Sequence, residues 1–277
     1  MLFLEKYTPK PKELIYHYCS SESFQAICEN KTIRLSDLFS MNDGTELKWG
    51  YSIWIEVANL LMKELGREFV DAVDKHIHEF SFHSLIISSS FSLKSDMLSQ
   101  WRAYSSDGNG YCVGFNAQDI FKLPVYPFKI IYNKKQQIKK ITETVKFIYF
   151  AESITKEKFS QKFFDHCFFL SAELASMKNP TFFEEKEIRA IHVLALKQSN
   201  KSLKLIDDEG EKVKFRFREN CPIAYLDYDL TNGGKTNPIK EVIIGPKNKS
   251  LVSGISIYLE TLEIENVVVK NSKVPYV

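Results

Sequence analysis

The apolar residues of this chain fall into short runs that alternate irregularly between strand-like and helix-like spacing. Strand-like runs occur at residues 13–19, 31–35, 85–92, 111–115, 128–132, 187–196, 212–218, 222–228, 239–244 and 267–270. Helical spacing occurs at residues 20–30, 46–82 with a break at Gly66, 136–177 and 250–262. Strands and helices that follow one another in this irregular order predict an α+β fold rather than a regularly alternating one.

The length of 277 residues is compatible with one large domain or two small ones. We find no internal repeat, no low-complexity tract and no linker rich in Pro, Gly or Ser. The sequence therefore predicts a single domain over residues 1–277. Its core should be a mixed assembly of strands, with two helical insertions, at about 46–82 and 136–177, packed on it. The charged stretch 197–211 is expected to be a connector, and residues 40–44 a turn.

Charge and cysteine usage exclude several classes of protein. Lys and Arg number 37 and Asp and Glu 35, so the net charge of +2 excludes a uniformly basic nucleic-acid coat and an acidic tail, although a local basic groove remains possible. Five cysteines without a C-x-x-C pair indicate buried thiols in a reducing compartment. No secretory leader or 18-residue apolar run is evident. We expect a cytoplasmic protein with no membrane contact.

His17 is the first candidate for a functional side chain. It lies in the middle of a predicted strand, between Tyr16 and Tyr18. A histidine in this setting is often a hydrogen-bonded structural residue. The functional alternative is that a neutral imidazole on a rigid strand, with one donor and one acceptor, holds a ribose hydroxyl or a carboxamide.

A second candidate group lies between residues 91 and 104. Trp101 and Tyr104 are three residues apart on a short predicted helix, for which Asp96 is the expected N-cap, so they share a face. They could belong to the core. The functional interpretation is an aromatic wall against a planar ring, with Ser92 at its edge and Arg102 available to a phosphate.

The third candidate group is acidic. If residues 185–189 form the start of a strand, Glu185, Glu187 and Arg189 point to one face. A solvated edge strand with internal ion pairs would explain this pattern. The alternative is a glutamate at the end of a central strand, facing a cleft, where it accepts a hydrogen bond from a sugar hydroxyl and stabilises developing positive charge.

Other motifs are weak. The segment 107–110 does not complete a G-x-G-x-x-G fingerprint, and no phosphate-binding loop occurs. His76, His78 and His83 are close in sequence, but i and i+2 lie on different helix faces, so no metal site is predicted. Glu184-Glu185-Lys186 fits the E-x-K element of some nucleases.

Taken together, short pieces of this sequence resemble a bacterial family called domain of unknown function 2971. The pieces, spread over about residues 14–276, are Tyr16-His17-Tyr18-x-Ser20, Asn42-Asp43-x-x-Glu46, Phe91-Ser92 with Asp96, Trp101 and Tyr104, Gly110, then Lys178, Phe182, Glu185, Glu187 and Arg189, and finally 240–246. The family name supplies no function.

The chain is also similar to the ADP-ribosyltransferases, in the branch with a strand-borne histidine, tyrosines around nicotinamide and a late glutamate. This resemblance implies an ADP-ribosyltransferase-like core. It also implies that His17 contacts a ribose of NAD, that Tyr104 or Trp101 stacks on nicotinamide, and that Glu187 or Glu185 is the catalytic acid. The remaining cofactor-binding residues would be Tyr18, Ser92 and Arg102.

The function predicted on this basis is cleavage of NAD at the nicotinamide–ribose bond, with NAD as co-substrate, no metal and an unknown acceptor that could be protein or nucleic acid. Glu187 is the preferred catalytic residue because it begins the apolar part of its strand. Two alternatives stay open. One is a non-enzymatic nucleotide-sensing or partner-binding protein of a bacterial defence or toxin system, and the other is a nuclease.

Overall fold

A computed structural model describes residues 6–38, 45–199, 202–205, 212–218 and 220–276. The expected turn at 40–44, and with it Asn42 and Asp43, lies outside these residues. In the described part, no helix combines the length and the apolar character that crossing a membrane requires.

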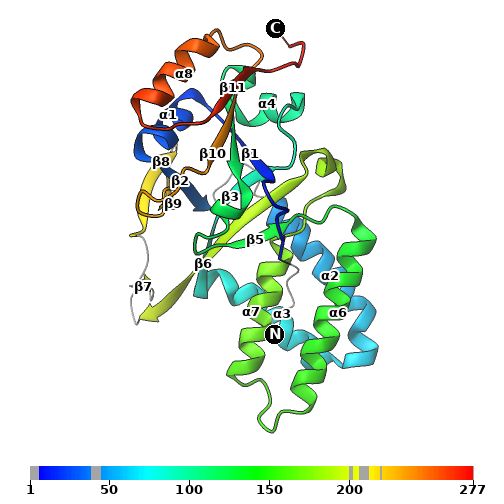
Figure 1. The fold of residues 1–277 in the computed structure, drawn as a ribbon. Coiled ribbons are helices and arrows are strands. Elements are labelled where there is room, and N and C mark those ends of the chain that lie inside the picture. Colours follow the sequence, from blue (N-terminus) through cyan, green and yellow to red (C-terminus); the bar gives the residue numbers. More distant parts are fainter. Residues whose placement is uncertain (1–5, 39–44, 200–201, 206–211, 219, 277) are drawn as a thin grey trace.

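The elements follow the irregular order that the sequence predicted (Figure 1). The strands are β1 Leu14–Cys19, β2 Thr32–Asp37, β3 Ser84–Ser92, β4 Tyr111–Asn116, β5 Tyr126–Lys129, β6 Glu187–Ser199, β7 Ser202–Leu205, β8 Lys214–Arg218, β9 Cys221–Asp229, β10 Ile239–Ile244 and β11 Val268–Asn271. The α-helices are α1 Ser21–Asn30, α2 Thr45–Leu65, α3 Arg67–His83, α4 Leu98–Tyr104, α5 Ala117–Ile120, α6 Lys134–Ser153, α7 Gln161–Leu174 and α8 Val252–Thr261. Two 3₁₀ turns are η2 Ser106–Gly108 and η3 Pro180–Glu185.

The strands form one mixed sheet, in which only the pair β10 and β11 is parallel among the described pairings. Its main path runs β11-β10-β4-β1-β3-β2-β9-β8. The long strand β6 pairs with the whole length of β3 through its residues 187–195, and it also pairs with β5 and β7. The structure thus confirms the α+β class, with a mostly antiparallel sheet.

The sheet splits beside β3, and this split creates the candidate site. One edge of β3 is paired with β6 throughout. Along the other edge, β1 pairs only at Tyr16 with Ser92, and β2 pairs only at Ser36 and Asp37 with Ser88 and Ile87. Among the described residues, no strand pairs with residues 89–91 on that edge, so their backbone groups need other partners.

Helix α1 shows how local sequence fixes the elements around the sheet. The Ser20 side chain accepts a hydrogen bond from the backbone N–H of Ser23 and caps the helix. Phe24, Ile27 and Cys28 then form the buried face. This face joins the main hydrophobic core over the sheet, close to α8 (Figure 1).

The four long helices α2, α3, α6 and α7 lie at the opposite end of the sheet from α1 and α8 (Figure 1). They share a hydrophobic cluster that includes Trp54, Phe163 and Leu170. At Gly50 of α2, an added Cβ would collide with the carbonyl oxygen of Leu174 in α7, so glycine allows the two helices to approach closely. The residues of the two expected helical blocks therefore pack mainly against each other.

Two local expectations were wrong. The stretch 197–211 is not only a connector, because β6 continues to Ser199 and pairs with β7 as a hairpin. Asp96 does not cap α4, whose N-cap residue is Met97 without a side-chain cap. The Asp96 carboxylate instead accepts hydrogen bonds from the indole of Trp101 and from Ser272.

Candidate functional site

A pocket of about 280 Å³ opens where the sheet splits beside β3. Its wall consists of residues from β1, β2, β3 and β6, with further contributions from α4, η3, β8 and β9. The volume is near the lower end of the ~300–1,000 Å³ typical of small-molecule sites. The pocket therefore suits a small ligand or one end of a longer one.

His17 occupies the gap that the split leaves. Its Nδ1 lies 3.0 Å from the backbone carbonyl oxygen of Ser90, one of the residues without a strand partner on this edge. A carbonyl oxygen only accepts, so Nδ1 carries the proton and donates. Burial lowers the pKa of His17, which keeps the ring neutral. Nε2 is then a bare acceptor, and the described residues give it no hydrogen-bond partner.

Glu187 is held in place by a dense set of donors. Its Oε1 accepts hydrogen bonds from Ser90 Oγ at 2.6 Å and from Arg189 Nε at 2.9 Å, and Arg189 Nη2 lies 2.8 Å away. Its Oε2 lies 3.3 Å from Lys178 Nζ. Burial alone would raise the pKa of Glu187, but the Arg189 and Lys178 charges, with the Ser90 hydrogen bond, outweigh burial and hold the pKa at about 2.

Glu185 has fewer partners than Glu187. Its Oε1 accepts a hydrogen bond from Tyr104 Oη at 3.0 Å, and its Oε2 accepts one from Lys178 Nζ at 2.7 Å. Burial raises the pKa of this carboxyl group, against the opposing charge of Lys178. Each oxygen thus accepts one hydrogen bond within the described part of the chain and can accept another from a ligand.

The two glutamates reach the pocket by a route that the sequence did not predict. Glu185 ends the 3₁₀ turn η3 and is not part of the strand. Lys186 then adopts a left-handed backbone conformation with φ 47°, and Glu187 begins β6. The expected shared strand face was therefore wrong for Glu185, but the three charged side chains of Glu185, Glu187 and Arg189 all line the pocket.

Tyr104 and Tyr18 both line the pocket, in different ways. The Tyr104 side chain remains 41% exposed, so its ring is accessible beside the Glu185 carboxylate. Tyr18 is buried, and its hydroxyl donates to the Lys94 carbonyl oxygen and accepts from the Met97 backbone N–H, both at 3.0 Å. Tyr18 therefore fixes the loop before α4.

Ser92 is a buried residue of the pocket wall with both hydrogen-bonding roles in use. Its Oγ donates to the carbonyl oxygen of Glu185 at 2.6 Å and accepts from the Lys94 backbone N–H at 3.0 Å. It fixes the backbone that presents Glu185.

The structure does not bring Trp101 or Arg102 into the pocket wall. Trp101 is fully buried, and its indole N–H donates to Asp96 at 2.7 Å. The Arg102 side chain is exposed, with Nε 4.0 Å from the Asp107 carboxylate. Although Trp101 and Tyr104 lie on the same short helix, only Tyr104 reaches the pocket.

Apart from Lys178 and Arg189, sequence reasoning missed the basic residues of the pocket. Lys178 is buried between the two glutamates, and Arg34, Arg216 and Arg218 lie in the wall. Arg216 and Arg218 alternate along β8, a period-2 spacing that places both on one face and could have been read from the sequence. With Arg189, this wall has five cationic side chains against the two carboxylates of Glu185 and Glu187, and Arg34 is paired with the Asp227 carboxylate at 2.8 Å. The remaining excess of positive charge favours an anionic ligand.

Within the described ranges, no group of three or more His, Cys, Asp or Glu side chains is placed to hold a metal ion. Of the three histidines close in sequence, His76 and His78 have different neighbours, and the side chain of His83 lies outside the described part. His78 Nδ1 contacts the Asp74 backbone carbonyl and its carboxylate, whereas the His76 ring packs against Phe163 and Phe164.

Comparison with known proteins gives one match. Residues 100–190 match a family model described as "Protein of unknown function (DUF2971)". No curated protein and no solved structure matches the chain. The matched segment contains Tyr104, Lys178, Glu185, Glu187 and Arg189, which meet in the pocket. The comparison thus supports the resemblance to this family of unknown function over residues 100–190.

Proposed function

We propose that the pocket binds NAD and cleaves its nicotinamide–ribose bond, as an ADP-ribosyltransferase-like enzyme or an NAD glycohydrolase. The observation that carries this proposal is the meeting of three groups in one pocket. These are the bare Nε2 acceptor of neutral His17, the accessible ring of Tyr104 and the partly free carboxylate of Glu185.

Each group suits one part of the ligand. His17 Nε2 and the Glu185 carboxylate both accept hydrogen bonds, and ribose hydroxyls donate them. The exposed Tyr104 ring offers a face to the planar nicotinamide. Arg216 and Arg218 suit the anionic pyrophosphate. Because the pocket is small, we expect the nicotinamide-ribose end to enter it with the pyrophosphate at its arginines, and the adenosine end to stay outside.

Cleavage of this bond requires little covalent chemistry from the protein. The bond electrons leave with nicotinamide, which departs as a neutral ring, and the ribose carbon develops oxocarbenium character until an acceptor nucleophile or water attacks it. A carboxylate hydrogen-bonded to a ribose hydroxyl stabilises this positive charge. We assign this contact to Glu185, because Glu187 Oε1 already accepts from Ser90 and Arg189.

Glu187 then has a positioning role. It balances the charges of Arg189 and Lys178, and Lys178 in turn holds Glu185. The sequence alone favoured Glu187 as the catalytic residue. The distribution of hydrogen bonds between the two carboxylates is the reason to prefer Glu185.

The test is release of nicotinamide from NAD by the purified protein, measured by liquid chromatography. We expect Glu185→Gln to lower the rate by at least about 100-fold, as for loss of one transition-state contact. The exposed neighbour Glu184 provides the control, because Glu184→Gln makes the same chemical change outside the pocket. Equal rates in the wild-type protein and Glu185→Gln would remove Glu185 from the mechanism.

A second function is binding of NAD or a related nucleotide without turnover. The many donors around Glu187 favour this second function. An ion-pair network of this kind fixes the side chains of the pocket, which binding alone requires and which needs no reaction. A thermal-shift experiment with NAD and ADP-ribose separates the cases. Stabilisation without nicotinamide release indicates a sensor, and no stabilisation by either ligand contradicts both proposals.

A further inference from the structure

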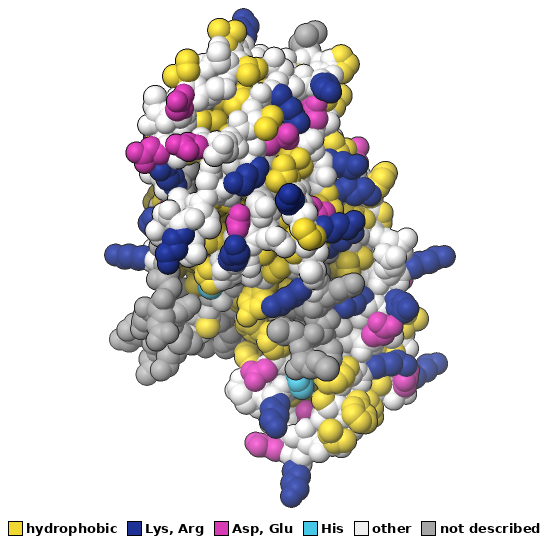
Figure 2. Space-filling model, viewed as in Figure 1, with side chains coloured by type: hydrophobic (Ala, Val, Ile, Leu, Met, Phe, Trp, Pro, Cys, Tyr) yellow, Lys and Arg dark blue, Asp and Glu magenta, His cyan; other side chains and the backbone are white. Residues whose placement is uncertain are grey.

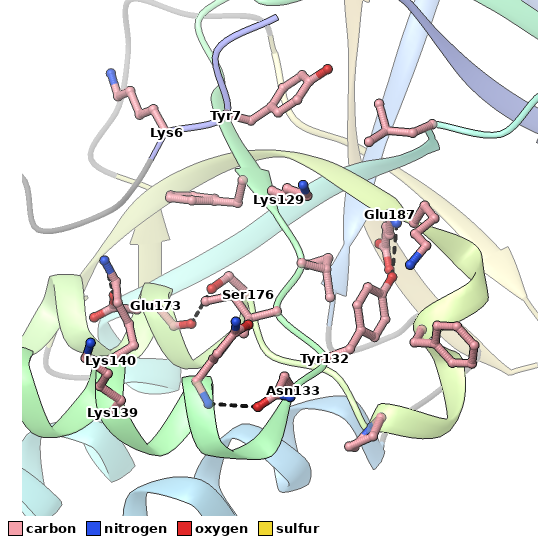
Figure 3. Close-up of a pocket in the computed structure, with 18 of the residues that line it drawn as sticks. Lys6, Tyr7, Lys129, Tyr132, Asn133, Lys139, Lys140, Glu173, Ser176 and Glu187 are labelled. Carbon is pink, nitrogen blue, oxygen red and sulfur yellow. Dashed lines mark hydrogen bonds and ion pairs between the residues drawn. The ribbon is translucent and has the colours of Figure 1, made fainter.

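Glu187 also lines a second and larger hollow, with a volume of about 1080 Å³ (Figure 3). Residues 128–133, the first turns of α6, the end of α7 and the turn η3 form most of its wall. Tyr132 points across the hollow to Glu187, and its hydroxyl accepts the Glu187 backbone N–H at 3.0 Å. The candidate NAD pocket and this hollow are therefore neighbours.

The described lining residues of the hollow include five lysines and no arginine, against the three carboxylates of Glu143, Glu173 and Glu187. The lysines are Lys6, Lys129, Lys139, Lys140 and Lys186, of which Lys139 pairs with Glu143 and Lys140 with Glu173. Figure 3 shows Lys6, Lys129, Lys139 and Lys140 beside this space, and Figure 2 shows more Lys and Arg than acidic side chains on the face viewed there. The described structure shows no carboxylate partner for Lys6, Lys129 or Lys186. Their charge is available to an anion of extended shape.

Aromatic rings lie beside these charges. The Phe183 side chain is 58% exposed, and Lys186 Nζ lies 5.0 Å from the centre of its ring. Tyr126 is 41% exposed, with Lys6 Nζ 5.1 Å from its ring centre. Exposed aromatic faces next to cations match a ligand in which flat rings alternate with negative charges.

Glu173 lies in the same wall and explains why a simple anion is not the best fit. It is only 1% exposed, and its Oε2 accepts a hydrogen bond from Thr144 Oγ1 at 2.7 Å. Its Oε1 lies 3.6 Å from Lys140 Nζ but accepts no hydrogen bond. A buried acceptor of this kind favours a ligand that also donates N–H groups.

We propose that this hollow binds single-stranded nucleic acid. Phosphates pair with the lysines, an unpaired base stacks on Phe183, and a base N–H group donates to Glu173. A duplex would keep its base faces stacked and unavailable, and a peptide made of acidic residues alone has no planar rings for the aromatic faces. The proposal does not depend on NAD chemistry in the neighbouring pocket.

The test is binding of a fluorescein-labelled 20-nucleotide single strand to the full-length chain, measured by fluorescence anisotropy without NAD. Combined replacement of Lys6, Lys129 and Lys186 by Gln removes about three phosphate contacts. At 0.1 M salt this should weaken binding about 100-fold and reduce the slope of log K against log salt by about 2, from a contribution of about 0.7 for each contact. All three side chains are exposed, so the fold should be unaffected.

The matched control replaces Lys63, Lys75 and Lys249, which are exposed and lie outside the hollow, by Gln. Both triple variants have the same net charge. If the control weakens binding as much as the first variant, general charge and not the hollow binds the strand, and the proposal is wrong.

Two further experiments distinguish single-stranded nucleic acid from other anionic ligands. Phe183→Ala should weaken binding of the single strand by about 10-fold without changing the salt slope, because it removes stacking and no charge. Unlabelled single strand should compete better than its duplex form and better than polyglutamate. Equal competition by polyglutamate, or no effect of Phe183→Ala, would show a general anion site instead.

Discussion

Replacing Glu187 by Gln tests the ion-pair network that organises the pocket. The substitution keeps the size of the side chain and removes its charge, which leaves two buried cations with less compensation. Arg189 then keeps its hydrogen bond to the Ala175 carbonyl oxygen, and Lys178 keeps its ion pair with Glu185. Breaking a buried pair on one side typically costs about 3–5 kcal/mol.

The pKa of Glu187 gives a second measure of the same loss. A carboxyl group lowered from 4.5 to about 2 contributes about 3 kcal/mol to the free energy of unfolding at pH 7, at 1.36 kcal/mol for each pKa unit. Because the folded-state pKa is the lower one, this stabilisation is complete above pH 4.5 and decreases as the pH falls towards 2. By pH 3 about half of it remains.

Urea unfolding at pH 7 and at pH 3 measures the difference in the free energy of unfolding between the wild-type protein and Glu187→Gln. We expect a gap of about 3 kcal/mol that narrows by about half at the lower pH. The charge of Glu187 also raises the pKa of Glu185, so the gap reports the loss of Glu187 together with its effect on Glu185. The exposed control Glu184→Gln should stay within about 0.5 kcal/mol of the wild type. A gap below about 1 kcal/mol at pH 7, or one that does not change with pH, would refute the network as described.

Three further substitutions test local features by the same unfolding assay. Tyr104→Phe removes the donor to Glu185 and should cost about 1.5–3 kcal/mol at pH 7, as for a hydrogen bond to a charged group; no change would show that the contact is not formed in solution. Gly50→Ala forces a methyl group against Leu174 and should cost about 1–3 kcal/mol, whereas a stabilised variant would contradict the close approach of α2 and α7. Ser20→Ala removes the cap of α1 and should cost about 1 kcal/mol; an unchanged midpoint would show that the cap contributes nothing.

Local sequence patterns predicted most elements, because helix caps and apolar periodicity act over a few residues. The helix from Ser21 to Asn30, the break at Gly66 and the strand through His17 all agree with the structure. The split of the sheet beside β3 could not be predicted in this way. It depends on how β1 and β2 share one edge of β3, and these pairings join residues far apart in the chain.

The candidate site, too, could be predicted only in part from local sequence patterns. His17, Tyr104, Glu185 and Glu187 were named from their residue types, and the structure places them in one pocket. Lys178 entered only through the family resemblance, because nothing local indicates that a lysine will be buried. Trp101 was grouped with Tyr104 by helical spacing, but spacing cannot tell which of two neighbouring side chains faces the core.

The most direct test of the account is binding of NAD to the wild-type protein and to His17→Ala, measured by isothermal titration calorimetry. The account predicts that NAD binds to the wild-type protein and that His17→Ala loses about tenfold or more in affinity, as expected when an acceptor for a ribose hydroxyl is removed. If NAD binds equally well to both proteins, or to neither, the pocket beside β3 is not an NAD site.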